Sequence, residues 1–226
     1  MARLARAVVA GFPHHLTQRG NRRQQTFFSD GDYLAYGGLM AQWCRQCGIE
    51  VWAYCLMPNH AHLIVVPISE DGLRRGIGEA HRRYSRAVNF RQGWRGHLWQ
   101  GRFASCVMDE PHLMAAVRYV ERNPVRARLV DRAEDWPWSS AAAHVAGRDD
   151  ALVRVAPLLE RTTGWVCTWS QWLAQDEDSA IGSRLQLHER TGRPMGSEGF
   201  MERLEIILGR RLSPGKPGRP RTKDPR

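Results

Sequence analysis

The chain has 226 residues, of which 42% are hydrophobic and nine are tryptophan, enough apolar material for one domain with an appendage. No apolar run is long enough to span a bilayer, and the basic N-terminal residues lack the apolar stretch of a signal peptide, so we expect a soluble, cytoplasmic protein. Five cysteines without regular spacing are typical of a reducing compartment and exclude a disulfide framework.

The formal net charge of +10 favours a polyanionic partner, and the charge is unevenly distributed. Residues 209–226 hold seven Lys or Arg and one Asp, so this tail supplies +6 of the total. We expect a disordered basic tail that adds salt-sensitive DNA affinity. Its segment 217–221, Pro-Gly-Arg-Pro-Arg, resembles an AT-hook core, in which Arg219 and Arg221 would bind a narrow minor groove.

The first part of the chain predicts a strand, a polar loop and a helix. Residues 4–18 alternate loosely and predict the first strand. Ser29 or Asp30 is the expected N-cap of a helix that runs to about Cys47. The loop between them is rich in hydrogen-bond donors that suit phosphate binding, although an ordinary basic loop is the alternative. The donors expected to contact nucleic acid are Arg19, Asn21 and Arg22.

Residues 50–56 and 60–66 predict two strands joined by a Pro58-Asn59 turn. Because side chains alternate along a strand, His60 and His62 project to the same side. Two adjacent imidazoles on a rigid strand form a potential metal-ligand pair. The alternative is a pair of core histidines that satisfy each other or the backbone, since an unpaired buried polar group costs roughly 1–3 kcal/mol. The spacing alone leaves both interpretations open.

Residues 72–90 predict an arginine-rich helix and residues 99–108 a fourth strand. The order strand, helix, strand, strand, helix, strand predicts an α+β fold, a ferredoxin-like split βαβ sandwich with helices on one face of an antiparallel sheet. Tyr84, among the arginines of the helix, suits stacking on a base. The arginines of this region that we expect to bind nucleic acid are Arg82, Arg83, Arg86 and Arg102.

Asp109-Glu110-Pro111 predicts the start of a third helix, which Pro124 would end. Tyr119 and Asn123 are four residues apart, so they share a face of this helix. If the helix packs where the two histidines emerge, a phenol and an amide oxygen join them. Alternatively, Asn123 is a helix cap and Tyr119 an aromatic at the edge of the core. The core-facing stripe consists of Leu113, Ala116, Val117 and Val120.

The rest of the chain predicts an appendage. Helices are expected at 179–188 and 197–208, and a helix-turn-helix DNA reader is one interpretation of that pair. We expect a main domain at 1–146, a helical appendage at 147–208 and then the basic tail.

The chain carries three motifs, Met57-Pro58-Asn59-His60-Ala61-His62, Tyr119-Val120-Glu121-Arg122-Asn123-Pro124-Val125-Arg126 and Glu134-Asp135-Trp136-Pro137-Trp138-Ser139-Ser140. Together they resemble the single-tyrosine HUH transposases, most closely the REP-associated tyrosine transposase branch. The resemblance runs from about Leu4 to His144 and implies that residues 1–146 are the catalytic domain. It implies that His60 and His62 bind a metal and that Tyr119 is the nucleophile. Asn123 would be the third ligand, on a shorter arm than the glutamine more often found there, and Arg126 would contact DNA.

The resemblance implies a metal-dependent endonuclease and strand transferase acting on single-stranded DNA at hairpin-forming repeats of the repetitive extragenic palindrome type. A tyrosine phenolate would attack the scissile phosphorus and form a covalent 5′-phosphotyrosine. The expected cofactor is Mg²⁺ or Mn²⁺, although two imidazoles and an amide would also suit zinc. No nucleotide cofactor and no membrane are expected, and the protein would be a monomer or homodimer associated with the bacterial nucleoid.

Two other functions fit the same residues. One is a catalytically silent DNA- or RNA-binding regulator on the same fold, in which the histidines are structural. The other is a zinc-dependent hydrolase, which would cleave phosphate bonds without a covalent intermediate.

Overall fold

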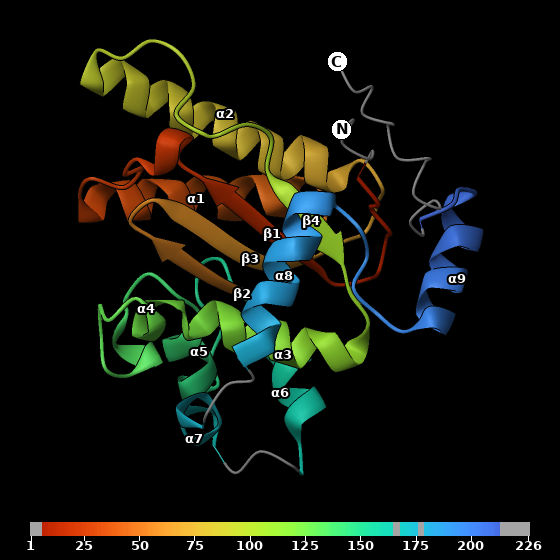
Figure 1. Ribbon diagram of the computed structural model, residues 1–226. Coiled ribbons are helices and arrows are strands. Elements are labelled where there is room, and N and C mark those ends of the chain that lie inside the picture. Colours follow the sequence, from red (N-terminus) through yellow and green to blue (C-terminus); the bar gives the residue numbers. More distant parts are fainter. Residues whose placement is uncertain (1–5, 165–167, 176–178, 213–226) are drawn as a thin grey trace, which may run out of the picture.

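The computed structural model describes residues 6–164, 168–175 and 179–212. A four-stranded sheet lies at its centre, with the order β2-β3-β1-β4 and antiparallel pairing throughout (Figure 1). Together with the crossover helices α1 and α2, the strands follow the predicted order along the chain, so the ferredoxin-like fold is confirmed. The elements are β1 (His14–Arg19), α1 (Asp30–Gln46), β2 (Ile49–Met57), β3 (His60–Pro67), α2 (Gly72–Gln92) and β4 (Ala104–Val107).

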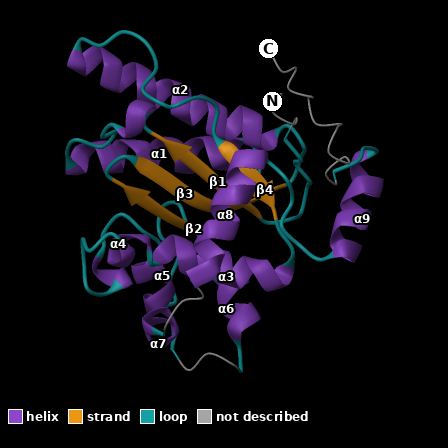
Figure 2. Ribbon diagram, viewed as in Figure 1, coloured by secondary structure: helices purple, strands orange, loops and turns teal. Residues whose placement is uncertain are grey.

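Helices cover both faces of the sheet (Figure 2). This follows from β3, which is apolar on each side: Leu63 and Val65 pack with the residues of α1 and α2, whereas Ile64 and Val66 belong to the opposite core. The two crossover helices cover one face, as the predicted sandwich requires. The opposite face is filled by the helices that follow β4, both those before residue 146 and those of the appendage. These are α3 (Glu110–Glu121), α4 (Asn123–Arg126), α5 (Ala141–Ala146), α6 (Ala156–Thr162), α7 (Trp169–Ala174) and α8 (Ser179–Thr191).

The last helix, α9 (Glu198–Leu208), packs elsewhere. Its Phe200 and Leu204 form a cluster with Ala7 and Val9 of the N-terminal segment, whereas α8 packs on α3 and β4. A helix-turn-helix unit is built from two helices that pack on each other. The helix-turn-helix interpretation is therefore wrong for α8 and α9. The division of the chain at residue 146 stays a prediction, and residues beyond it share a core with the sheet.

Two predicted strands are shorter than expected. The first begins at His14, because the apolar residues before it pack against α9 instead of pairing with the sheet. The fourth begins at Ala104, since Gly101 has a φ of 144° and turns the chain before it. At the start of the predicted fourth strand, Trp99 forms only an isolated bridge to Gly20, which follows β1.

The third helix begins where the sequence predicts. Asp109 caps it by accepting a hydrogen bond from the His112 amide at 3.3 Å. However, α3 ends at Glu121, and a second short helix, α4, begins at Asn123. Pro124 therefore does not end a helix but lies in the first turn of α4, where its missing N–H costs nothing.

A buried glutamate fixes the C-terminal end of α3. Glu121 Oε1 accepts hydrogen bonds from Ser140 Oγ at 2.5 Å and from His144 Nδ1 at 2.7 Å. Its Oε2 accepts one from Trp169 Nε1 at 2.7 Å. Leaving such a buried acceptor without one of its partners typically costs about 1–3 kcal/mol. This network therefore holds α3 firmly against α5 and α7.

Other segments of the chain cover both edges of the sheet. Met195 pairs with β4, donating its amide to the Val107 carbonyl at 2.8 Å. Along β2, Leu56 donates its amide to Trp138 at 2.8 Å, and Ser140 donates to the Tyr54 carbonyl at 3.0 Å. The backbone groups of both edge strands are thus partly paired within the chain. None of the described helices is both long and apolar enough to cross a membrane.

Buried histidines should make the fold sensitive to acid. Burial lowers the pKa of His81 to about 3 and that of His14 to about 4, from an ordinary value of 6.5. Below pH 6.5 the unfolded chain then binds protons that the folded chain does not, so stability falls as the pH falls toward these values. We expect a loss of about 1.4 kcal/mol per pH unit for each such histidine. Thermal unfolding measured between pH 7 and pH 4.5 checks this.

The variant His81→Gln separates this effect from carboxylate titration. His81 Nε2 lies 2.9 Å from the Tyr36 hydroxyl, and a glutamine amide can replace that hydrogen bond without titrating. We expect the unfolding temperature of the variant to fall less steeply with pH. An unchanged slope would contradict the assignment.

Candidate active site

The two histidines of the hairpin project toward α3. In the antiparallel register Thr17 of β1 lies opposite His62, and Arg19 lies opposite His60. Residues directly opposite each other share a face of the sheet, and so do residues two apart along a strand. His15, two residues before Thr17, is therefore on the same face as the histidine pair. One end of the sheet thus presents three imidazoles and a guanidinium on one face.

In both histidines of the pair, Nδ1 faces a neighbouring side chain. His60 Nδ1 lies 2.6 Å from Asn59 Oδ1, and the Asn59 amide group in turn donates to the Arg23 carbonyl. His62 Nδ1 lies 3.0 Å from His15 Nε2. Burial lowers the pKa of His60 to about 4 and that of His62 well below its ordinary value, so both rings are neutral at pH 7. Nε2 is then the atom that each ring offers to a metal ion.

Asn123 and Tyr119 reach this pair from the other side. The Asn123 side chain hydrogen-bonds with His60, and this contact raises the pKa of His60 against the larger, opposite effect of burial. The Nδ2 atom of Asn123 is buried and has no hydrogen-bond partner among the described residues. The Tyr119 ring meets the His62 ring edge to face, with centroids 5.8 Å apart. The four residues expected to carry the chemistry thus lie together.

Tyr119 is closely surrounded and only 8% exposed. The Arg126 guanidinium lies 3.8 Å from the centroid of its ring and also donates to the Tyr119 carbonyl at 2.8 Å. On another side α8 passes so close that a Cβ added to Gly182 would lie 3.0 Å from Tyr119 Cε2. A glycine at this position permits the approach of α8. The phenol therefore stands between a cation and a helix backbone.

Two residues of this site were not predicted from the sequence. His15 is fully buried beside His62, and Glu189 of α8 lies with its Oε1 3.8 Å from His15 Nδ1. His15, His62 and Glu189 form a cluster that could hold a metal ion, the only such group of three among the described residues. The sequence His14-His15 could have indicated a third histidine near the pair, because consecutive histidines on a strand put one imidazole on each face. No feature of the sequence singles out Glu189.

A cavity of about 650 Å³ opens in front of the histidines. Of the predicted nucleic-acid-binding residues, Arg19 and Arg102 line it, and Arg126 lies beside Tyr119. Asn21 and Arg22 belong to a single 3₁₀ turn, Asn21–Arg23, whose Arg23 also lines the cavity. Cationic groups next to a metal-ligand set are suited to the phosphates of a nucleic acid.

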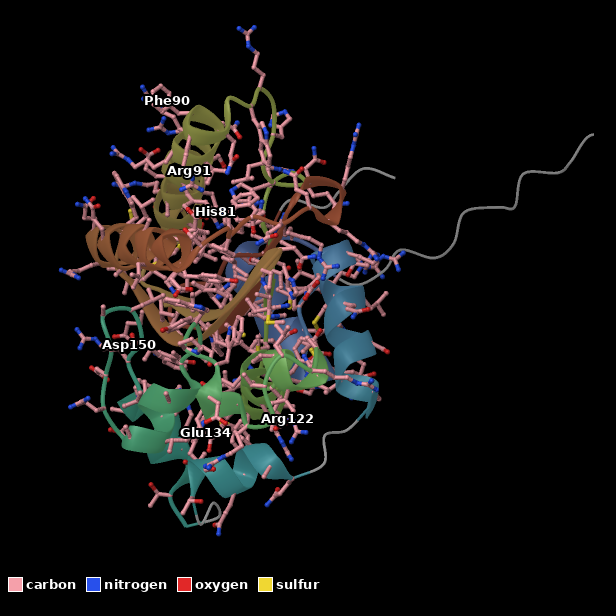
Figure 3. The ribbon with its side chains drawn as sticks, turned by 90° about the vertical axis from the view of Figure 1, so that its left-hand side faces the viewer. His81, Phe90, Arg91, Arg122, Glu134 and Asp150 are labelled. Carbon is pink, nitrogen blue, oxygen red and sulfur yellow. The ribbon has the colours of Figure 1, made fainter. Side chains whose placement is uncertain are left out.

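The other predicted arginines are elsewhere. Arg82, Arg83 and Arg86 of α2 line a separate hollow with Phe90, which is 90% exposed and projects from the outer end of α2 (Figure 3). Arg82 and Arg83 both bond to Glu79. Arg219 and Arg221 fall outside the described residues.

Tyr84 is buried in the core. Its hydroxyl donates to the Thr26 carbonyl at 2.7 Å, and its ring packs edge to face with that of Tyr36. The expectation that it stacks on a base is therefore wrong.

The residues present fit a divalent metal ion. Two neutral imidazoles and an amide oxygen converge, and the unpartnered Asn123 Nδ2 is a sign that this amide is oriented through its oxygen. Such a set suits Mn²⁺ or Zn²⁺ by ligand preference, whereas Mg²⁺ fits when water and phosphate oxygens complete the shell.

This geometry agrees with comparisons to known proteins. The family described as Transposase IS200 like matches residues 9–123, which include β1 to β4, both histidines, Tyr119 and Asn123. The chain therefore belongs to the IS200-like transposases, a class of tyrosine transposases that act on DNA.

The relatives come from the branch that the sequence motifs indicate. A REP-associated tyrosine transposase of Escherichia coli is 24% identical over 127 residues, which cover 56% of this chain and 73% of the relative. A Haemophilus influenzae protein classed with the same transposases is 29% identical over 121 residues, 48% of this chain and 69% of the relative. The solved structure of a REP-associated tyrosine transposase bound to a REP hairpin shares the fold, with a TM-score of 0.56 and 24% identity over 67% of this chain and 90% of that one.

Proposed function

We propose that this transposase is a metal-dependent endonuclease and strand transferase that acts on single-stranded DNA at hairpin-forming repeats. The observation that carries the proposal is the meeting of Tyr119 and Asn123 with the distant His60 and His62 of β3 in front of a cavity lined by arginines. The relative whose structure is bound to a REP hairpin supports hairpin DNA as the substrate class.

In the proposed reaction Tyr119 supplies the nucleophile. Its phenolic oxygen loses a proton and bonds to the scissile phosphorus, the bond from phosphorus to the 3′-oxygen breaks, and that oxygen takes up a proton. The product is a 5′-phosphotyrosine and a free 3′-hydroxyl, which can reverse the step on another strand. Arg126, 3.8 Å from the ring centroid, places positive charge over the ring that carries the reacting oxygen.

His60, His62 and Asn123 would hold a Mg²⁺ or Mn²⁺ ion. When bound, the ion would offset negative charge on a phosphoryl oxygen. Because the phosphoester is exchanged and not hydrolysed, the proposed reaction needs no nucleotide cofactor.

We propose that the catalytic domain spans residues 1–146 and that the protein acts in the cytoplasm of a bacterium.

The silent DNA-binding protein remains the second candidate for one reason. Tyr119 is only 8% exposed and α8 packs against its ring, which limits the access of a DNA phosphate to this side chain. A protein that never opens this contact would bind DNA without cleaving it.

A single assay separates the two functions. Hairpin-containing single-stranded DNA, labelled separately at each end, is incubated with the protein and Mn²⁺ or Mg²⁺ and resolved on a denaturing gel. We expect a metal-dependent covalent adduct that carries only the DNA on the 3′ side of the cut, and no adduct with EDTA. Binding across a panel of hairpins with neither adduct nor cleavage would favour the silent protein.

A further inference from the structure

Two buried side chains lie directly behind His62. His15, which is fully buried, has its Nε2 3.0 Å from His62 Nδ1. On its other side, His15 Nδ1 lies 3.8 Å from Glu189 Oε1. His15 Nδ1 and Glu189 Oε1 are both buried, and neither has a hydrogen-bond partner among the described residues. Unpaired buried polar atoms are costly, so a potential donor and a potential acceptor left side by side require an explanation.

The contact between the two imidazoles is edge to edge. The rings of His15 and His62 are parallel within 3°, and their centroids are 5.2 Å apart. Rings stacked face to face would be in contact at about 3.5–4.0 Å. Together with the 3.0 Å distance between nitrogens, this separation places the rings side by side, so that an N–H of one ring is directed at the lone pair of the other.

When Glu189 is ionised, only one arrangement of protons satisfies all three groups. The edge-to-edge contact pairs an N–H of one ring with a lone pair of the other, which leaves two arrangements when each ring carries one N–H. If His62 Nδ1 carries its proton, His15 Nε2 accepts it, His15 Nδ1 carries an N–H toward Glu189, and His62 Nε2 keeps a free lone pair. In the opposite arrangement His62 Nε2 is protonated, and a His15 lone pair faces the carboxylate, which accepts but cannot donate when ionised.

The ionisation of Glu189 sets the pH range in which it accepts a hydrogen bond from His15. Burial raises the pKa of Glu189 to about 7, and the charge of Arg19 and a hydrogen bond with the Thr17 side chain act in the opposite direction, so the carboxylate is an acceptor above that pH. Its distance from His15 Nδ1 is about 1 Å longer than an N–H···O hydrogen bond. A small movement of α8 toward β1 would therefore complete the bond.

We propose that His15 and Glu189 are positioning residues of the metal site, which hold His62 in the tautomer whose Nε2 is free to bind the ion. The inference rests on the proposed function in one respect, namely that His62 is a ligand. It adds that α8, which lies beyond the matched family region, completes the site. Outer partners of this kind typically change metal affinity about 10–100-fold.

The tautomer can be measured without any activity. In the metal-free full-length protein labelled with ¹⁵N-histidine, long-range ¹H–¹⁵N correlation spectra distinguish an Nδ1–H from an Nε2–H imidazole. We expect His62 to be the Nδ1–H form in the wild type and a mixture of both forms in Glu189→Leu. A wild-type His62 in the Nε2–H form would overturn the proposal.

Mn²⁺ affinity provides a second, independent test of the positioning role. Titration with Mn²⁺, followed by the paramagnetic resonance of the free ion, should show binding about 10–100-fold weaker in His15→Leu. In His15→Gln the amide oxygen can accept from His62 Nδ1, so most of the affinity should return. The matched control is His14→Leu, an equally buried histidine on the other face of β1, which should bind Mn²⁺ as the wild type does.

These outcomes separate the proposal from the proposed function. Equal Mn²⁺ affinity in His15→Leu and His14→Leu, with both folded by circular dichroism, would overturn the positioning role. If the wild type binds no Mn²⁺, the proposed function fails, whereas the tautomer measurement still decides whether His15 and Glu189 fix His62. If His15→Leu does not fold, the comparison of Glu189→Leu with the wild type carries the test, because Glu189 is less deeply buried than His15.

Discussion

Replacing Tyr119 with phenylalanine is expected to abolish the covalent protein–DNA adduct and to leave the fold and the metal site intact. Phenylalanine keeps the ring that packs between Arg126 and Gly182 and meets His62 edge to face, so only the hydroxyl is lost. Loss of a covalent nucleophile typically lowers the rate by several orders of magnitude. We therefore expect no adduct and a cleavage rate at least about 10³-fold lower.

The control is Tyr33→Phe. Tyr33 is buried to the same degree, at 7% exposure, but it belongs to α1 on the other face of the sheet, where its ring stacks on Phe27 and Trp138. This variant should form the adduct at the wild-type rate. If Tyr119→Phe still cleaves and no adduct forms in either protein, the zinc-dependent hydrolase becomes the better description. An adduct that persists in Tyr119→Phe points to a different nucleophile.

The second large effect is expected at the metal site, where His60→Ala should weaken Mn²⁺ binding and DNA cleavage together. Removing a direct ligand should cost at least as much as removing an outer partner, which typically costs about 10–100-fold in affinity. His60 is only half-buried, so the substitution should cost the fold little. Paramagnetic resonance of free Mn²⁺ measures affinity, and the labelled hairpin measures cleavage. The control is His97→Ala, the same change at an exposed loop position.

Asn123 offers a finer test of the same set. In Asn123→Leu the amide oxygen near His60 is removed, and Mn²⁺ binding should weaken. Asn123→Gln restores the oxygen on a longer arm and should bind more tightly than Asn123→Leu. Wild-type affinity in both His60→Ala and Asn123→Leu would move the metal to the cluster of His15, His62 and Glu189.

The sequence predicted features that depend on local periodicity. Strand alternation put His60 and His62 on one face, and helical spacing put Tyr119 near Asn123. Both inferences need only neighbours in the chain, and the structure does bring these residues together. The element order was equally local, so the ferredoxin-like fold could be predicted. Their roles as ligands and nucleophile stay predictions until the variants above are measured.

What the sequence did not predict depends on pairing across the fold. His15 reaches His62 because β1 pairs with β3 in a register that places Thr17 opposite His62, and no local pattern fixes that register. Glu189 is an acidic residue on a largely polar helix, so the sequence alone indicates a surface position. Only the packing of α8 on β4 brings it near the site. The first strand was predicted too long because Ala7 and Val9 are apolar, as buried strand residues are. Their side chains pack against α9 instead.

The covered edges of the sheet have a consequence for how copies of the protein can associate. A strand with free backbone groups is a template on which a second molecule can extend the sheet, and that contact leads either to dimers or to aggregates. Here Met195 occupies the β4 edge, and Trp138 and Ser140 occupy part of the β2 edge. A second copy could join the sheet at these positions only by displacing the chain's own segments. Self-association through a continuous sheet is therefore disfavoured, and a pair of these molecules would have to meet through side-chain surfaces.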